Sequence, residues 1–193
     1  MDRNTTNNPG SRIPEPQIIE EIRLGNKKAF EQLFFEYYYS LCRFGVRYAN
    51  SSELSRDAVQ DVFLKIWNGR ETWQIQSSLK AYLYRAVRNQ AINLREQQEV
   101  WNVLPEEPES PFTFTEELTA SEADENSGKL FSQIWDLVEK MPTQRKLVFE
   151  LHRQHGLTYK EISEVMRIAP KTVENHMSRA LQELRNKLHV DTG

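Results

Sequence analysis

The chain has 193 residues, of which 38% are hydrophobic and 27% are charged, and its formal net charge is −3. This length fits one domain or two small ones, with a large solvated surface. No run of about 18 apolar residues is present, which excludes a membrane-spanning helix, and the polar N-terminus contains no secretory signal. The single cysteine, Cys42, excludes an internal disulfide and a cysteine-based zinc site. We therefore expect a cytoplasmic protein that is not inserted in a membrane.

The net charge hides an uneven distribution along the chain. Residues 1–95 carry a net charge of +4, residues 96–128 carry −10 and residues 129–193 carry +3. Charge is best judged segment by segment when a nucleic-acid partner is considered. Two mildly basic blocks flank one acidic strip, so the overall negative charge does not exclude such a partner.

The N-terminal half predicts a tail followed by four helices. Residues 1–15 are polar and carry few apolar side chains, so we expect a flexible tail. From there to about residue 98, apolar side chains recur at i, i+3, i+4 and i+7, the spacing of helices with one buried face. The third of these helices should begin after Ser51 or Ser52, either of which is a good N-cap, and the fourth should span about residues 78–98.

Residues 99–126 interrupt this helical pattern. Three prolines remove helix, and many acidic side chains add like charge, so we expect an extended acidic linker. Helical periodicity returns at Leu130 and continues past Pro142, and no alternating β pattern is present. The sequence therefore predicts an all-α protein of two small helical domains. The expected parts are a flexible tail at 1–15, a helical domain at 16–98, the linker at 99–126 and a second helical domain at 127–190.

Residues 158–188 have the pattern of a helix-turn-helix. Thr158 and Glu161 suit a capping box, in which each side chain accepts a hydrogen bond from the other residue's free amide. Pro170 suits the first turn of a second helix, where its missing N–H has no cost. That helix would offer polar side chains from its N-terminal half to the major groove of DNA. An ordinary helical hairpin with a solvated polar face remains the alternative.

The polar side chains of this second helix have the chemistry of base recognition. Arg179 suits a bidentate contact with guanine or a phosphate contact, Asn175 suits adenine, and Glu174 can accept from the amino group of cytosine. Phosphate contacts orient a protein on DNA without reading its sequence. The side chains best placed for them are Lys171, Arg153 and Lys160.

Two helices of the N-terminal half also carry polar faces. The third places Asp57, Gln60, Asp61 and Lys65 on one side, although many helices have such a solvated face. The fourth interleaves tyrosines with arginines and asparagines, which suits stacking on unpaired bases and neutralisation of phosphates. The alternative is that Tyr82 and Trp73 belong to the core.

The order of these parts resembles the sigma-70 family of RNA polymerase sigma factors, in its extracytoplasmic-function (ECF) group. The segment DAVQDVFLKIW (57–67) is similar to that family's core-polymerase-binding helix, and SSLKAYLYRAVRNQAINLRE (77–96) resembles its −10 recognition helix. Residues 141–188, from MPTQRK to RNKL, resemble its −35-binding domain. The resemblance covers most of residues 16–98 and 127–188, in the family's order and spacing.

This resemblance implies a promoter-specificity subunit that binds core RNA polymerase, recognises −35 and −10 elements and assists DNA melting. It also implies an anti-sigma factor as a partner, and it implies no cofactor or metal. The implied polymerase contacts are Asp57, Gln60, Asp61, Phe63, Leu64 and Lys65. The implied −10 contacts are Trp73, Ser77, Ser78, Arg85, Arg88, Asn89 and Asn93. The implied −35 contacts are Lys171, Thr172, Glu174, Asn175, His176, Ser178 and Arg179.

Two other classes of protein fit the sequence less well. A stand-alone transcriptional regulator would use only the C-terminal helix-turn-helix and would need neither polar face of the N-terminal half. An enzyme lacks support, because a chain with 7 glycines shows no Gly-rich loop for a phosphate. His152 and His155 are spaced i, i+3 without a third ligand, so we expect a pair on a helix surface rather than a metal site.

Overall fold

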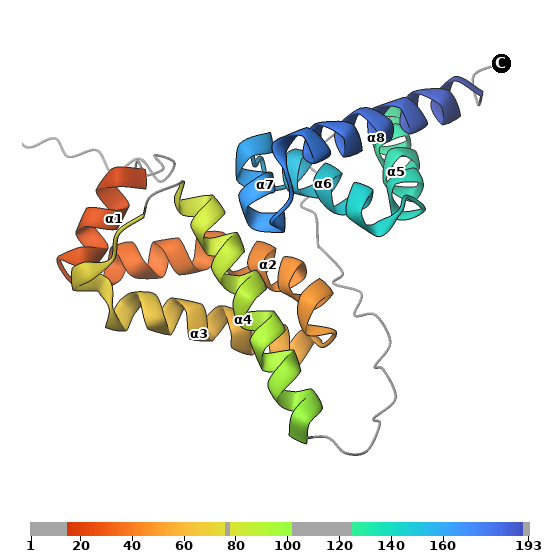
Figure 1. The fold of residues 1–193 in the computed structure, drawn as a ribbon. Helices are drawn as coiled ribbons and strands as arrows, with labels where there is room; N and C mark the ends of the chain where they lie inside the picture. Colours follow the sequence, from red (N-terminus) through yellow and green to blue (C-terminus); the bar gives the residue numbers. More distant parts are fainter. Residues whose placement is uncertain (1–14, 76–77, 102–124, 191–193) are drawn as a thin grey trace, which may run out of the picture.

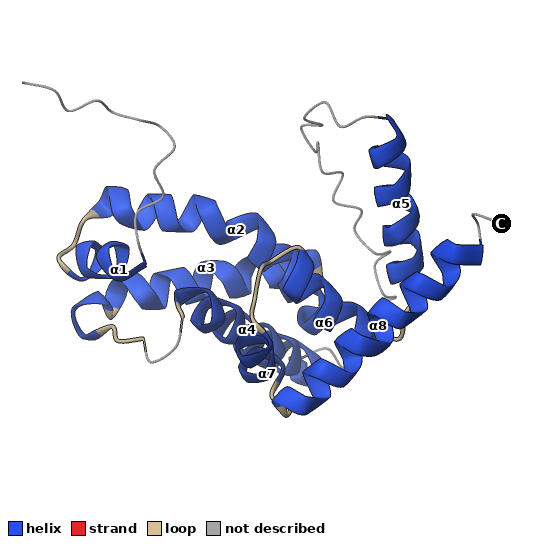
Figure 2. Ribbon diagram, turned by 90° about the horizontal axis from the view of Figure 1, so that it is seen from above, coloured by secondary structure: helices blue, strands red, loops and turns tan. Residues whose placement is uncertain are grey.

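The computed structural model describes residues 15–75, 78–101 and 125–190, and all regular elements in these ranges are helical (Figures 1 and 2). This confirms the predicted all-α class. Nearly all of the expected tail and most of the expected linker lie outside the described residues. The elements are α1 (Glu15–Arg23), α2 (Lys27–Ala49), α3 (Ser52–Asn68), the 3-10 helix η1 (Arg70–Thr72), α4 (Leu79–Trp101), α5 (Glu125–Glu139), α6 (Thr143–Arg153), α7 (Tyr159–Met166) and α8 (Pro170–Val190). In these ranges no helix is both long and apolar enough to cross a bilayer.

Helices α1 to α4 build the N-terminal helical domain around a shared core. Helix α2 packs against α3 and α4, and α1 packs against α2 and η1. Phe30, Phe34 and Phe63 form an edge-to-face cluster between α2 and α3, with ring centroids 5.9 and 5.0 Å from Phe63. Such aromatic pairs add to the free energy of burying the rings. This packing fixes which side of α3 is left for solvent.

A side-chain cap sets the start of α3. The Ser51 hydroxyl accepts hydrogen bonds from the amides of Glu53 and Leu54, which lack partners within the helix. The preceding helix ends where Asn50 takes a left-handed conformation with φ of 57°. The prediction of a serine N-cap at this point is confirmed, and Ser51 provides it.

Gly45 lies at a close approach between α2 and α3. A Cβ atom at this position would lie 2.4 Å from the Ser55 hydroxyl oxygen and 3.3 Å from a methyl group of Val87. Ser55 is buried and donates a hydrogen bond of 2.7 Å to the carbonyl oxygen of Cys42. We predict that Gly45→Ala lowers the free energy of unfolding by about 2 kcal/mol, because an overpacked core must shift its neighbours. Denaturant unfolding followed by circular dichroism measures this loss.

The control for this prediction removes the obstructing atom. In the double variant Gly45→Ala/Ser55→Ala, the new methyl group no longer meets a hydroxyl oxygen. The double variant should therefore lose less stability than the sum of the two single variants, as expected for residues in contact. Strict additivity would contradict a clash between these two side chains.

Helices α5 to α8 build the C-terminal helical domain. Helix α6 packs against α7 and α8, and α5 packs beside the C-terminal half of α8 (Figures 1 and 2). The predicted capping box is confirmed, since Thr158 Oγ1 accepts from the Glu161 amide at 3.3 Å and Glu161 Oε2 accepts from the Thr158 amide at 2.7 Å. Arg167 ends α7 in the left-handed region, and α8 begins at Pro170 as predicted. Helices α7 and α8 form the helix-turn-helix.

The two helical domains are in contact with one another. Helix α4 of the first domain packs against α7 of the second, and Figure 1 shows α7 beside the N-terminal part of α4. This arrangement brings together residues that are far apart in the sequence.

Candidate nucleic-acid interface

The N-terminal half of α8 presents a polar face to solvent. Its opposite face is buried, with Val173, Met177 and Ala180 each exposing 1% or less. These anchors hold the helix against α6 and α7 and direct the remaining side chains outward. The exposed ones are Lys171, Glu174, Asn175, Ser178 and Arg179, while Thr172 and His176 are half-buried. The structure therefore brings all the residues predicted for the −35 element onto one accessible part of α8.

One ion pair on this face can be exchanged for contacts with a ligand. Lys171 Nζ lies 2.9 Å from a carboxylate oxygen of Glu174, with 73% and 52% of the two side chains exposed. An exposed pair of this kind stabilises a protein only slightly. Both side chains can therefore turn toward phosphates or bases at little cost.

His176 lies near Arg145, a basic residue that is not among the predicted contacts. Burial, followed by the positive charges of Arg145 and Arg179, lowers the pKa of His176. The ring is therefore neutral at neutral pH. Arg145 comes from the first turn of α6 and forms an ion pair of 2.7 Å with Glu183 of α8. The sequence near Arg145 does not predict that it lies close to the polar face of α8, because this position results from the packing of α6 on α8.

Helix α4 presents part of the side chains predicted for the −10 element. Arg85 and Asn93 are exposed, and Arg88 and Asn89 are half-buried. The Arg88 guanidinium lies 5.2 Å from the centre of the Tyr48 ring, so this side chain packs inside the domain. Arg85 and Asn93 are thus the most accessible of the four.

The segment before α4 contains three of the predicted −10 contacts, and one of them, Trp73, is buried. Trp73 is 7% exposed and its ring makes an edge-to-face contact with Tyr82, with centroids 5.9 Å apart. The interpretation of Trp73 as a core residue is therefore favoured over direct contact with a base. Ser78 caps the start of α4 by accepting from the Ala81 amide at 3.1 Å. Ser77 lies outside the described residues.

Helix α3 places an exposed leucine among polar side chains. Leu64 is 57% exposed, and Asp57, Gln60 and Lys65 are exposed beside it. By contrast, Phe63 is 2% exposed and belongs to the aromatic cluster described above, so it supports α3 and has no surface for a partner. The prediction that Phe63 contacts the polymerase directly is therefore corrected, because its side chain is buried.

The half-buried Asp61 of α3 is linked to α4. Gln90 Nε2 donates to Asp61 at 2.8 Å, and Lys65 Nζ donates to Gln90 Oε1 at 2.7 Å. These hydrogen bonds orient two of the predicted polymerase contacts from the neighbouring helix.

The expected surface pair of histidines is not on a helix surface. Helix α6 ends at Arg153, and His155 lies beyond it against the ring of Tyr84, with centroids 5.2 Å apart. His152 Nδ1 lies 2.9 Å from the carbonyl oxygen of Leu157. The prediction was wrong for His155, because α6 is shorter than the sequence pattern suggested. Within the described ranges, no group of three or more metal-ligating side chains is present.

A helix-turn-helix with an exposed polar second helix, together with a helical domain that exposes arginine and asparagine, defines a DNA-binding protein. The comparisons identify its family. The family model for sigma-70 region 2 matches residues 33–99, and that for sigma-70 region 4 matches residues 131–184. The chain belongs to the sigma-70 family of RNA polymerase sigma factors, in its ECF group, as the sequence resemblance indicated. It is a transcription initiation factor, from a family of non-catalytic factors.

Relatives match nearly the whole chain. The ECF RNA polymerase sigma-E factor of Haemophilus influenzae is 26% identical over 183 residues, covering 92% of this chain and 96% of the relative. The sigma-E factor of Escherichia coli K12 is 25% identical over 184 residues, covering 92% and 95%.

Two solved structures share the fold. CnrH, in complex with the cytosolic domain of CnrY, has a TM-score of 0.54 and 19% identity, covering 92% of this chain and 98% of that one. The sigma factor RpoE from Bartonella quintana, in complex with the anti-sigma factor NepR, has a TM-score of 0.51 and 22% identity, covering 85% and 99%.

Proposed function

We propose that this sigma factor divides promoter recognition between its two helical domains, while a face of α3 holds core RNA polymerase. The domain at 16–98 would bind the polymerase and the −10 element, and the domain at 127–190 would bind the −35 element. The linker at 99–126 joins them, and the tail at 1–15 precedes them. The observation that carries this proposal is the polar face of α8. The opposite side of the helix is buried in the domain, so the polar side chains are held toward solvent, where DNA can reach them.

The proposed polymerase contact is centred on Leu64. An exposed leucine ringed by polar side chains is typical of a protein-binding surface, where an apolar anchor is desolvated and the rim stays polar. Leu64 is 57% exposed and has no packing role in the core. The polar members of this contact are Asp57, Gln60, Asp61 and Lys65.

The proposed DNA contacts lie on α4 and α8. On α4, Arg85 and Asn93 are exposed, and with Asn89 they would follow the unpaired −10 strand. On α8, Arg179 and Asn175 would contact base edges, and Lys171 would bind a phosphate. His176 would act as a neutral hydrogen-bonding group because its pKa is lowered by burial and by the neighbouring arginines.

The similar structures suggest a further partner. CnrH and the Bartonella quintana RpoE were each solved with another protein bound, and NepR is named as an anti-sigma factor. We propose that an anti-sigma factor controls this chain as well. The protein would work in the cytoplasm, where the polymerase and the promoters are, without catalysing a reaction of its own.

Transcription in vitro tests this function. The chain is mixed with core RNA polymerase and a randomised promoter library, and the transcribed sequences are recovered. We expect two enriched elements at a fixed spacing, with weak binding of promoter duplex by the chain alone, because the polymerase supplies the avidity that joins two weak sites. Tight specific binding by the free chain, with no gain on adding polymerase, would instead indicate the stand-alone regulator.

A further inference from the structure

An open groove runs beside the polar face of α8, between this helix and the first turn of α6. Its volume is about 320 Å³, several times the ~30 Å³ that a water molecule occupies in the liquid, so it has room for a phosphate group. Of the described side chains that line it, three are basic and one is acidic. The lining residues are Arg145, Arg179, Gln182, Glu183, Asn186 and Lys187. We call this feature the α6–α8 groove.

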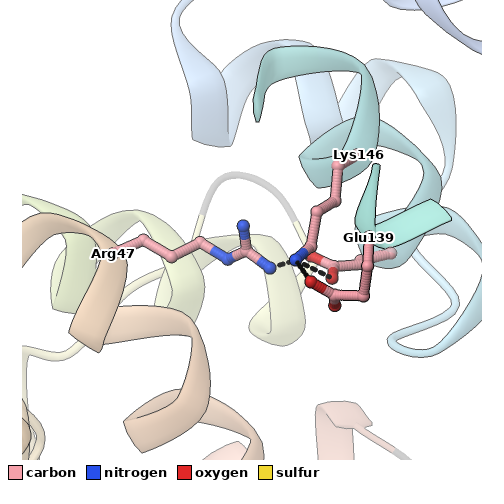
Figure 3. A network of polar contacts seen from close by, with 4 residues as sticks. Arg47, Glu139 and Lys146 are labelled. Atoms are coloured by element: carbon pink, nitrogen blue, oxygen red, sulfur yellow. Dashed lines mark hydrogen bonds and ion pairs between the residues drawn. The ribbon is translucent and has the colours of Figure 1, made fainter. Parts of the chain in front are cut away.

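Two successive basic residues of α6 have different surroundings. Lys146 turns toward Glu139 and Glu150, which balance its charge within the protein (Figure 3). Arg145 turns toward α8 instead, where its Nη1 atom donates to Glu183 at 2.7 Å. Among the residues that the structure describes, the Nε atom of Arg145 has no hydrogen-bond partner. A guanidinium has five N–H donors, so Arg145 keeps unused donors beside the groove.

Glu183 holds two of the basic side chains of the groove. Its carboxylate oxygens accept from Arg145 at 2.7 Å and from Lys187 at 2.9 Å. The hydrogen bond from Lys187, supported by that from Arg145, lowers the pKa of Glu183, so the carboxylate is charged at neutral pH. The Arg145 side chain is 20% exposed and that of Lys187 is 44% exposed. Both cations therefore remain within reach of a ligand that enters the groove.

Arg179 connects the groove to the face proposed for the −35 element, because it belongs to both. Together with Arg145 it adds to the effect of burial in lowering the pKa of His176, so both arginines lie close to that ring. A helix in the major groove of DNA is bordered by the sugar–phosphate backbone, which side chains of neighbouring elements contact. Helix α6 packs along α8. We therefore expect one DNA backbone to pass Arg145 when the polar face of α8 meets the bases.

We propose that the α6–α8 groove binds one backbone phosphate of the −35 duplex through Arg145 and Lys187, and that Glu183 limits this attraction. The inference rests on the proposed function, because the polar face of α8 brings the duplex to the groove. The contact orients the domain on DNA without reading sequence. Glu183 is a positioning residue: it holds the two cations in place, while its own charge repels the phosphate.

The salt dependence of DNA binding tests this contact. The full chain is titrated with a fluorescent −35 duplex, and with a duplex of scrambled sequence, at several salt concentrations, and anisotropy gives the affinity. Each phosphate contact contributes about 0.9 to the slope of log affinity against log salt. Arg145→Gln should reduce the slope by about this amount and weaken both duplexes alike, by roughly five- to tenfold at about 0.1 M salt. Arg145→Lys should keep most of the slope, because lysine also binds phosphate as a point charge.

Glu183→Gln should have the opposite effect. It removes a negative charge that faces the phosphate, so both duplexes should bind at least about twofold more tightly. The gain should be smaller in the double variant Arg145→Gln/Glu183→Gln, because residues that act on one phosphate are coupled. Misfolding cannot tighten binding, so this variant keeps the test independent of any stability lost with the ion pair.

The matched control is Arg185→Gln. It makes the same substitution at an exposed position of α8 that does not line the groove, and it should leave the slope unchanged. An unchanged slope in Arg145→Gln, or an equal reduction in Arg185→Gln, would overturn the phosphate contact. Weaker binding by Glu183→Gln would overturn the role of Glu183.

A groove that serves an acidic protein instead of DNA would leave duplex binding unchanged in every variant, and this result would also overturn the proposal. Transcription by the unmodified chain with core polymerase is run in parallel. A failure of the proposed function shows there, as a lack of promoter-specific transcripts, and not in the salt slopes, which report on a backbone contact with a duplex of any sequence.

Discussion

Replacing Leu64 with aspartate should weaken the binding of core RNA polymerase by at least about 30-fold. Fully burying a leucine side chain is worth roughly 1.5–3 kcal/mol, and an unpaired carboxylate at the same place adds a desolvation cost. The fold should be retained, because Leu64 is 57% exposed and lies outside the aromatic cluster that supports α3. Titration of labelled chain with core polymerase measures the affinity, and thermal unfolding measures the stability.

The matched control is Leu24→Asp. Leu24 is 79% exposed and belongs to the connection between α1 and α2, so the same change is made on the same domain outside α3. It should leave polymerase affinity within about twofold of the unmodified chain, as expected for a surface change outside an interface. A similar loss in both variants would mean that the added charge acts through the domain as a whole, and the Leu64 contact would have to be abandoned.

Replacing Arg179 with alanine should reduce transcription from a −35-dependent promoter by about 10- to 100-fold, because a bidentate arginine–guanine pair is worth about 1–3 kcal/mol of discrimination. Polymerase binding should not change, since Arg179 lies on α8 in the other domain. Selection from a promoter library should show relaxed preference at one −35 position. Arg179→Lys should also relax this preference, because lysine keeps the charge but cannot make a bidentate contact.

The outcome for Arg179→Lys separates base reading from phosphate binding. A phosphate contact would be retained largely by lysine, and its loss in Arg179→Ala would weaken all promoters alike and reduce the salt dependence. Arg185→Ala, which removes the same charge from an exposed position further along α8, should affect the selected sequence little. An unchanged base preference in both Arg179 variants would reject base reading by this side chain.

The helices and their ends follow from local sequence, which is why they could be predicted. The capping box of Thr158 and Glu161 needs only residues three apart, and Pro170 marks the start of α8 without reference to any other segment. The polar face of α8 could be predicted for the same reason. Helical periodicity distinguishes its buried residues from the rest over several turns.

The roles of single aromatic and histidine residues could not be predicted in this way. Phe63 and Trp73 sit in segments where either burial or exposure fits the pattern, and only packing across helices decides between them. His155 meets Tyr84, which is distant in the sequence and belongs to the other domain. Contacts of this kind depend on how two domains meet, and local periodicity carries no information about that.

Gln90 links the α3 face proposed for polymerase to α4, the helix proposed for the −10 strand. Its side-chain amide donates to Asp61 and accepts from Lys65, both on the face proposed for polymerase, while its own helix α4 carries the face proposed for the −10 strand. A polymerase group that takes either partner from Gln90 therefore changes the hydrogen bonding of α4. Thermodynamic linkage then requires reciprocity: if polymerase alters the affinity for the −10 strand by some factor through this amide, the strand alters the affinity for polymerase by the same factor. The shared amide would thus make recruitment and strand capture cooperative within a single small domain.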